Sequence, residues 1–198
     1  MLTFNINQPP PIHRELKAEK QRLTIRKKQL IKYSIISDGA HGTALLCLYL
    51  TDLLNGLGLL AVVGLGTVIA VVLATTLKKQ LRTADLLTVA SVAVATAFAV
   101  GGMVHGLPDA TVAGSLLAGL LTGSIVFTSS LIGRQMLQVF TAIEQLKSLA
   151  ESEIAEQEML QLCRENPDLE EYRQQARQIL RPNLTFGELQ AMRDWLKQ

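Results

Sequence analysis

Residues 86–133 read LLTVASVAVATAFAVGGMVHGLPDATVAGSLLAGLLTGSIVFTSSLIG, and Asp109 is the only charged residue among them. A helix needs roughly 20 apolar residues to cross the hydrocarbon core of a bilayer. The stretch therefore holds two candidate spans, at about 86–107 and 110–133, and a third uncharged stretch of similar length lies at about 57–77. These segments predict an all-α, polytopic membrane protein, and they exclude an ordinary soluble domain, a disordered chain and a disulfide scaffold.

The charged residues, 18% of the 198 in the chain, are concentrated at its two ends. Residues 1–32 carry eight basic and two acidic residues, a net charge of +6. Residues 134–198 carry eight basic and eleven acidic residues, a net charge of −3. Lys and Arg beside membrane spans stay on the cytoplasmic side. We therefore expect a basic cytoplasmic arm at 1–32, in contact with anionic lipid headgroups, and a cytoplasmic tail at 134–198.

The basic residues between the apolar segments decide how often the chain crosses the membrane. Lys78 and Arg82 follow the second segment, and Arg134 follows the last one. If all of them share the cytoplasmic side with the arm, the chain must cross an extra time at 33–54. We therefore expect a four-helix transmembrane bundle in a bacterial-type inner (cytoplasmic) membrane, with both termini cytoplasmic; a re-entrant or interfacial helix at 33–54 is the alternative. The expected spans are about 33–54, 57–77, 86–107 and 110–133.

Small residues recur at every fourth position of the apolar segments, so each row lies along one face of its helix. Helices associate in lipid through close van der Waals approach at such rows. Two roles are open for them: packing inside one bundle, and self-association into a homo-oligomer through the row Ser115, Gly119 and Gly123. The other rows are Ala93, Ala97 and Gly101, and Gly66, Ala70 and Ala74.

Six polar residues lie near the ends of the expected spans, where ionisable groups are often functional. On the outer side, Asp52, His105 and Asp109 form a candidate cluster that binds a cation or carries a proton, and ordinary turn chemistry is the alternative. On the inner side, Asp38 and His41 lie three residues apart on one helix face. No His/Cys pattern with metal-ligand spacing occurs, so we expect no metal site. The six residues are Asp38, His41, Asp52, Asn55, His105 and Asp109.

The basic arm shows a helical repeat, because Leu16, Leu23 and Leu30 recur every seven residues with Lys or Arg between them. The spacing predicts an amphipathic helix from about residue 12 that lies on the inner leaflet or packs on protein. Nucleic-acid binding is not expected, because residues 14–32 contain no aromatic platform on which bases stack.

The tail is expected to form three helices, at about 134–164, 167–180 and 186–197, with a Thr185–Glu188 capping box at the start of the last one. The last two helices are too short to bury a sizeable core alone. They need a partner surface, which is the preceding helix, another subunit or another protein. Apolar and aromatic residues anchor such interfaces, and the candidate partner-binding positions are Tyr172, Phe186, Leu189, Met192 and Trp195.

The chain contains no hydrolase, P-loop, zinc-protease or dinucleotide-binding motif, so we expect neither an enzyme nor a cofactor. The pattern favours a non-enzymatic accessory or partner-binding component of a membrane complex, for example with an exclusion, immunity or defence role, that self-associates through its bundle. The alternatives are an oligomeric pore lined by Thr and Ser, and an ion-transport subunit centred on Asp52, His105 and Asp109.

Overall fold

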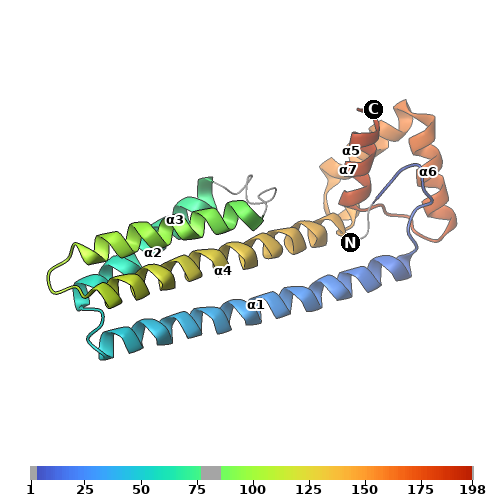
Figure 1. Ribbon diagram of the computed structural model, residues 1–198. Helices are drawn as coiled ribbons and strands as arrows, with labels where there is room; N and C mark the ends of the chain where they lie inside the picture. Colours follow the sequence, from blue (N-terminus) through green and yellow to red (C-terminus); the bar gives the residue numbers. More distant parts are fainter. Residues whose placement is uncertain (1–3, 77–85, 198) are drawn as a thin grey trace. The chain divides into compact units, whose positions relative to one another are not determined.

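The computed structural model describes residues 4–76 and 86–197, and within these ranges the chain is all-helical (Figure 1). The described residues include no strand; an isolated β-bridge pairs Ser148 with Thr185. The all-α prediction is confirmed for this part of the chain. In chain order the elements are α1 His13–Leu50, α2 Gly56–Thr76, α3 Leu86–His105, α4 Val112–Gln145, the 3₁₀ turn η1 Leu149–Glu151, α5 Glu153–Glu165, α6 Pro167–Gln178 and α7 Phe186–Trp195.

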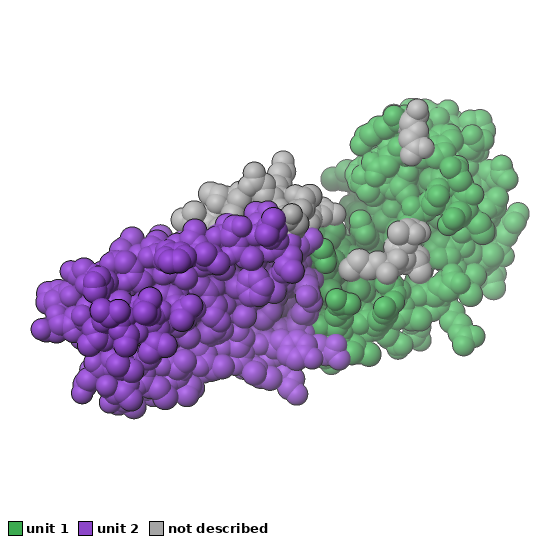
Figure 2. Space-filling model, viewed as in Figure 1, with its two compact units in different colours: residues 1–28, 138–198 green, residues 29–137 purple. Residues whose placement is uncertain are grey.

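The chain divides into two compact units (Figure 2). The apolar unit comprises residues 29–137, and the terminal unit comprises residues 1–28 together with 138–198. Helices α1 and α4 each contribute residues to both units. The terminal unit thus combines the two ends of the chain, which the sequence treats as separate segments.

Two helices of the described chain, α3 and α4, are long and apolar enough to cross a membrane. The searched apolar part of α2, Gly56–Gly66, is shorter than a span. The end of the expected span at 57–77 lies outside the described residues, as do Lys78 and Arg82. The two long apolar helices are compatible with a membrane protein, and the four-span arrangement stays a prediction.

Helix α1 joins the basic arm to the first expected span. The sequence predicts an amphipathic helix in the arm and a separate span at 33–54, whereas α1 runs without a break from His13 to Leu50. It ends there because Asp52 takes a left-handed φ of 55° and the Leu54 N–H donates to the carbonyl of Leu48 over 3.0 Å. Many helices end at a residue with this left-handed conformation.

Helices α3 and α4 lie side by side (Figure 1), and residues of two small-residue rows are in contact between them. A Cβ atom on Gly119 would lie 2.4 Å from the carbonyl oxygen of Ala97, and one on Gly101 would lie 3.1 Å from that of Ser115. A Cβ atom on Gly123 would lie 2.8 Å from the Cβ of Ala97. The two backbones therefore approach as closely as only small residues permit.

The prediction of one continuous helix at 134–164 is wrong, because this stretch is divided among the end of α4, η1 and α5. Two serines after α4 cap the elements that follow it: Ser148 caps η1 and Ser152 caps α5. The Ser148 side chain accepts from the Ala150 N–H over 3.3 Å, and the Ser152 side chain accepts from the Ala155 N–H over 3.4 Å. Ser and Thr compete with the helix in this way. The turn also carries Leu149 into the core of the terminal unit, where it is 1% exposed.

The core of the terminal unit lies between α5, α6 and α7. Each of these helices buries one apolar face, as their amphipathic spacing predicts. The tail therefore obtains its partner surface from α5, which the sequence includes among three alternatives. The buried core residues are Leu149, Ala155, Met159, Cys163, Leu169, Tyr172, Ala176, Leu184, Leu189 and Met192.

Candidate binding site of the terminal unit

The basic arm of α1 packs on the end of α4 within the terminal unit. Leu23 is buried, and the Lys27 ammonium lies 4.6 Å from the centroid of the Phe140 ring, which is a cation–π contact. Part of the apolar face of the arm, at Leu23, thus packs on protein, whereas Ile25 is 58% exposed. The charged face stays exposed, for example at Arg22 and Arg26.

A groove of about 970 Å³ lies between α1 and the loop that joins α6 to α7. On the α1 side, His13, Lys17 and Lys20 line it. On the loop side, Leu180 is 89% exposed and holds a left-handed φ of 59°, an uncommon backbone conformation for a residue with a bulky side chain. The volume is that of a ligand-binding cleft. The apolar lining residues are Leu16, Ile25, Leu146, Leu180 and Pro182.

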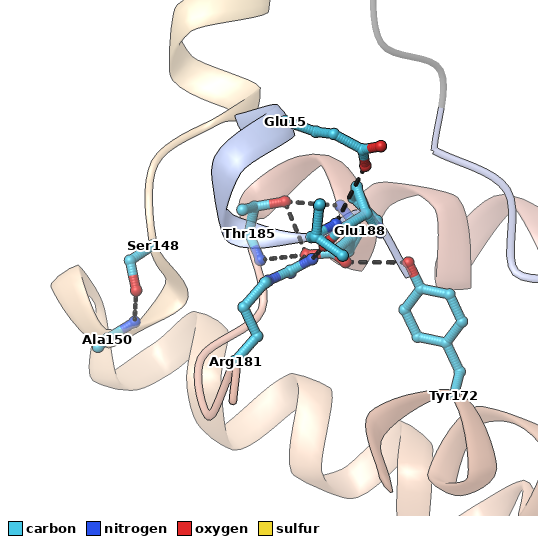
Figure 3. Close-up of polar contacts among 9 residues, drawn as sticks. Glu15, Ser148, Ala150, Tyr172, Arg181, Thr185 and Glu188 are labelled. Carbon is cyan, nitrogen blue, oxygen red and sulfur yellow. Dashed lines mark hydrogen bonds and ion pairs between the residues drawn. The ribbon is translucent and has the colours of Figure 1, made fainter. Parts of the chain in front are cut away.

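A buried carboxylate, Glu188, bonds to two residues that line the groove, Arg181 and Thr185 (Figure 3). The expected capping box is confirmed: the Glu188 N–H donates to the Thr185 hydroxyl over 3.3 Å, and the Thr185 N–H donates to the Glu188 Oε2 over 2.8 Å. The same carboxylate accepts from the Tyr172 hydroxyl over 2.9 Å and pairs with the Arg181 guanidinium. Glu188 is 0% exposed and Arg181 is 3% exposed, so both charges are compensated inside the protein.

The environment of Glu188 also sets the protonation of its neighbour. Burial, and then the negative charge of Glu188, raise the pKa of Tyr172 far above its ordinary value. The hydroxyl therefore stays protonated and acts as a hydrogen-bond donor. Arg181 uses one nitrogen for Glu188 and another for the carbonyl oxygen of Pro11, while its buried Nε has no partner within the described protein.

The N-terminal segment, residues 4–12, completes the terminal unit. A Cβ atom on Gly187 would lie 2.3 Å from the Phe4 ring, so α7 has a glycine where this aromatic side chain rests. Ile6 packs against the core, and the Trp195 indole donates to the Asn7 side chain over 3.2 Å. No periodic pattern in the sequence points to this contact, because the segment is irregular and joins residues at opposite ends of the chain.

The predicted partner-binding residues of the tail pack in or against the core of the terminal unit. Tyr172, Leu189 and Met192 are at most 3% exposed and belong to the core, so they are not accessible to a separate protein. Phe186 and Trp195 are half-buried and pack against the same core. A separate protein would therefore contact other surfaces of the unit, which include this groove and a smaller pocket of about 420 Å³ lined in part by Trp195.

The small-residue rows of α3 and α4 serve to pack helices within one chain. Ala93, Ala97 and Gly101 meet Ser115, Gly119 and Gly123, as the distances above show. Self-association through the Ser115 row would require α3 to leave it. A Cβ atom on Gly66 would lie 3.9 Å from the Thr122 methyl, and the surroundings of Ala70 and Ala74 lie outside the described residues.

The two turns of the apolar unit are joined by an amide, Asn55. Its side chain donates to the carbonyl of Pro108 over 2.9 Å and accepts from the Gly58 N–H over 2.8 Å. Asp52 and Asp109 have left-handed φ values of 55° and 60°, which is turn geometry. The described residues contain no group of three or more His, Cys, Asp or Glu side chains placed to hold a metal ion, and His105 does not form one with these aspartates.

The other polar pair, Asp38 and His41, makes separate contacts. The Ser34 hydroxyl donates to Asp38 over 3.3 Å on the same helix. His41 Nδ1 lies 2.7 Å from the carbonyl oxygen of Ser37, and Nε2 lies 3.1 Å from the Ser124 hydroxyl of α4. His41 thus connects α1 to α4.

No protein-family model, curated protein or solved structure matches this chain. Its function is therefore inferred from the residues and their geometry.

Proposed function

We propose that this chain is an integral inner-membrane protein, with four spans and both termini cytoplasmic, that acts as a non-enzymatic accessory or partner-binding component of a membrane complex. An exclusion, immunity or defence role suits such a component. The observation that carries the proposal is the combination, in one chain, of membrane-length apolar helices with a polar unit that has its own core and an open groove.

The polar groups of the terminal unit support a binding role over a chemical one. All the bonds described for the Glu188 carboxylate go to groups of its own fold, so the bonds that stabilise the unit occupy the best-placed acid. Cys163 is 3% exposed, and burial raises the pKa of its thiol, which keeps it in the poorly nucleophilic protonated form.

The pore alternative has less support from the same helices. Its lumen requires hydroxyl groups that face water, but three of the hydroxyl side chains of α3 and α4, Thr96, Ser115 and Thr122, are buried. Each donates to the carbonyl oxygen four residues earlier, over 2.8 Å. These hydroxyls therefore satisfy the backbone inside a packed bundle.

The proposal is tested by purifying the full tagged chain from native membranes in mild detergent. A stoichiometric protein partner should co-purify with the wild type. The Glu188→Ala variant, in which the terminal unit is disrupted, should lose this partner, although the wild type and the variant both stay in the membrane fraction. The exposed variant Glu158→Ala should keep the partner. Ion flux in liposomes that persists in Glu188→Ala would contradict the proposal in favour of a pore, and a periplasmic reporter that is active after Arg82 would contradict the four-span topology.

A further inference from the structure

We propose that the groove of the terminal unit binds a second copy of this chain, whose exposed Ile154 and the acidic residues around it insert between α1 and the α6–α7 loop. The inference concerns the terminal unit alone and goes beyond the proposed function. It gives the chain a self-association surface outside the bundle. Within the bundle, α3 already covers the small-residue row of Ser115, Gly119 and Gly123.

The groove has the features of a protein-docking surface. Its apolar lining includes two strongly exposed side chains, Leu180 at 89% and Ile25 at 58%. Exposed apolar side chains gathered in one cleft mark interaction sites on folded proteins. Lys17 and Lys20 lie along one side, opposed by the single acidic lining residue Glu151 among those described. The groove therefore fits a segment that presents an apolar side chain flanked by carboxylates.

Helix α5 presents such a segment. Ile154 is 79% exposed in its first turn, although the same helix buries Ala155, Met159 and Cys163 in the core. Glu153 precedes Ile154, and the helix Glu153–Glu165 contains four glutamates and one arginine. The Ile154 side chain is therefore accessible to a second chain.

The charges of the two surfaces are complementary. The α1 wall of the groove carries the two cations Lys17 and Lys20. It faces a net negative helix when two copies meet through α1 of one and α5 of the other. Opposite charges across an interface steer association and set its register.

The two surfaces are also neighbours in the chain, which favours a closed dimer. Glu151 lines the groove, and Ile154 follows three residues later. In a two-fold interface, each copy contributes the same patch, so the Ile154 segment of each chain occupies the groove of the other. Such a contact closes on itself and does not extend into a filament.

The test uses the full chain in mild detergent, with its mass measured by light scattering during size exclusion. The groove variant is Lys17→Glu/Lys20→Glu, and the α5 variant is Glu153→Lys/Gln157→Lys. Each should raise the dimer dissociation constant at least about tenfold, because like charges then face each other in both contacts. The two variants mixed together should form a 1:1 heterodimer, because both contacts of the mixed dimer join opposite charges.

Matched controls separate docking from folding and from net charge. Arg22→Glu/Arg26→Glu makes the same charge change on the same helix outside the groove lining and should leave the dimer intact. Unfolding followed by Trp195 fluorescence should show that every variant retains a folded terminal unit.

Three results would overturn the inference: a monomeric wild type, variants that fail to form a heterodimer, or a control pair that dissociates the dimer as strongly as the groove pair. A groove variant of unchanged mass that binds more weakly to vesicles of anionic phosphatidylglycerol would assign the groove to lipid headgroups instead. A monomeric wild type that still retains its stoichiometric partner would refute this inference and leave the proposed function intact.

Discussion

Replacement of Glu188 by alanine should destabilise the terminal unit by about 4 kcal/mol. The change leaves the Arg181 guanidinium, 3% exposed, without its counter-charge. Breaking a buried ion pair by removing one partner costs about 3–5 kcal/mol. The Tyr172 hydroxyl loses its acceptor and α7 loses its capping box, at about 1 kcal/mol each. These costs do not add in full, because one carboxylate serves all of them.

Urea unfolding of the full chain in detergent measures this loss. Trp195 is the only tryptophan of the chain and lies at the end of α7, so its fluorescence reports on the terminal unit. With a urea dependence of about 2 kcal/mol per molar, a loss of about 4 kcal/mol lowers the midpoint by about 2 M.

A surface ion pair provides the control. Arg193 donates to both carboxylate oxygens of Glu158 over 2.6 and 2.5 Å, and the two side chains are 42% and 36% exposed. Exposed pairs contribute about 0–1 kcal/mol even with good geometry. Glu158→Ala should therefore leave the midpoint nearly unchanged. If Glu188→Ala is no more destabilising than Glu158→Ala, burial of the ion pair is not what stabilises the unit.

Three further variants test other parts of the structure. Gly119→Ala should lower the thermal stability of the detergent-solubilised chain by about 1–3 kcal/mol, because the new Cβ meets the backbone of α3, whereas Gly133→Ala, with nothing within 4 Å, should not. Between about pH 9 and about pH 11, the Tyr172→Phe variant should lose less folding stability than the wild type. The raised pKa of Tyr172 means that, above about pH 10, only the unfolded state of the wild type releases this proton. The free energy of unfolding of the wild type therefore falls as the pH rises. Phe4→Ala should lower the free energy of unfolding in urea by about 2 kcal/mol, because it removes the half-buried ring that contacts Gly187. Equal stability of the variant and the wild type would refute the packing of the N-terminal segment on α7.

Local chemistry made part of the terminal unit predictable. The capping box could be identified from Thr185 and Glu188 alone, because its bonds lie within four residues. The break after α4 could not, although Ser148 and Ser152 mark it, because serines also occur inside helices. What favours the break is the burial of Leu149, whose N–H donates to the carbonyl of Leu184 over 2.9 Å.

The candidate site was only partly predictable for the same reason. Tyr172 and Trp195 have the properties of interface residues, and the sequence correctly shows that they need a covering surface. It does not show that α5 and the N-terminal segment supply that surface within the chain. The groove itself was missed, because its two walls are α1 and a loop more than a hundred residues later.

The sequence by itself determined the helical class, the apolar segments and the faces on which small residues recur, because helix period and side-chain size are properties of neighbouring residues. The tertiary structure alone decided which faces meet: α3 covers the Ser115 row of α4, and residues 4–12 close the terminal unit over α7. Many pairings of the same amphipathic faces satisfy the local pattern equally well. Only the packing of residues far apart in the chain selects one of them.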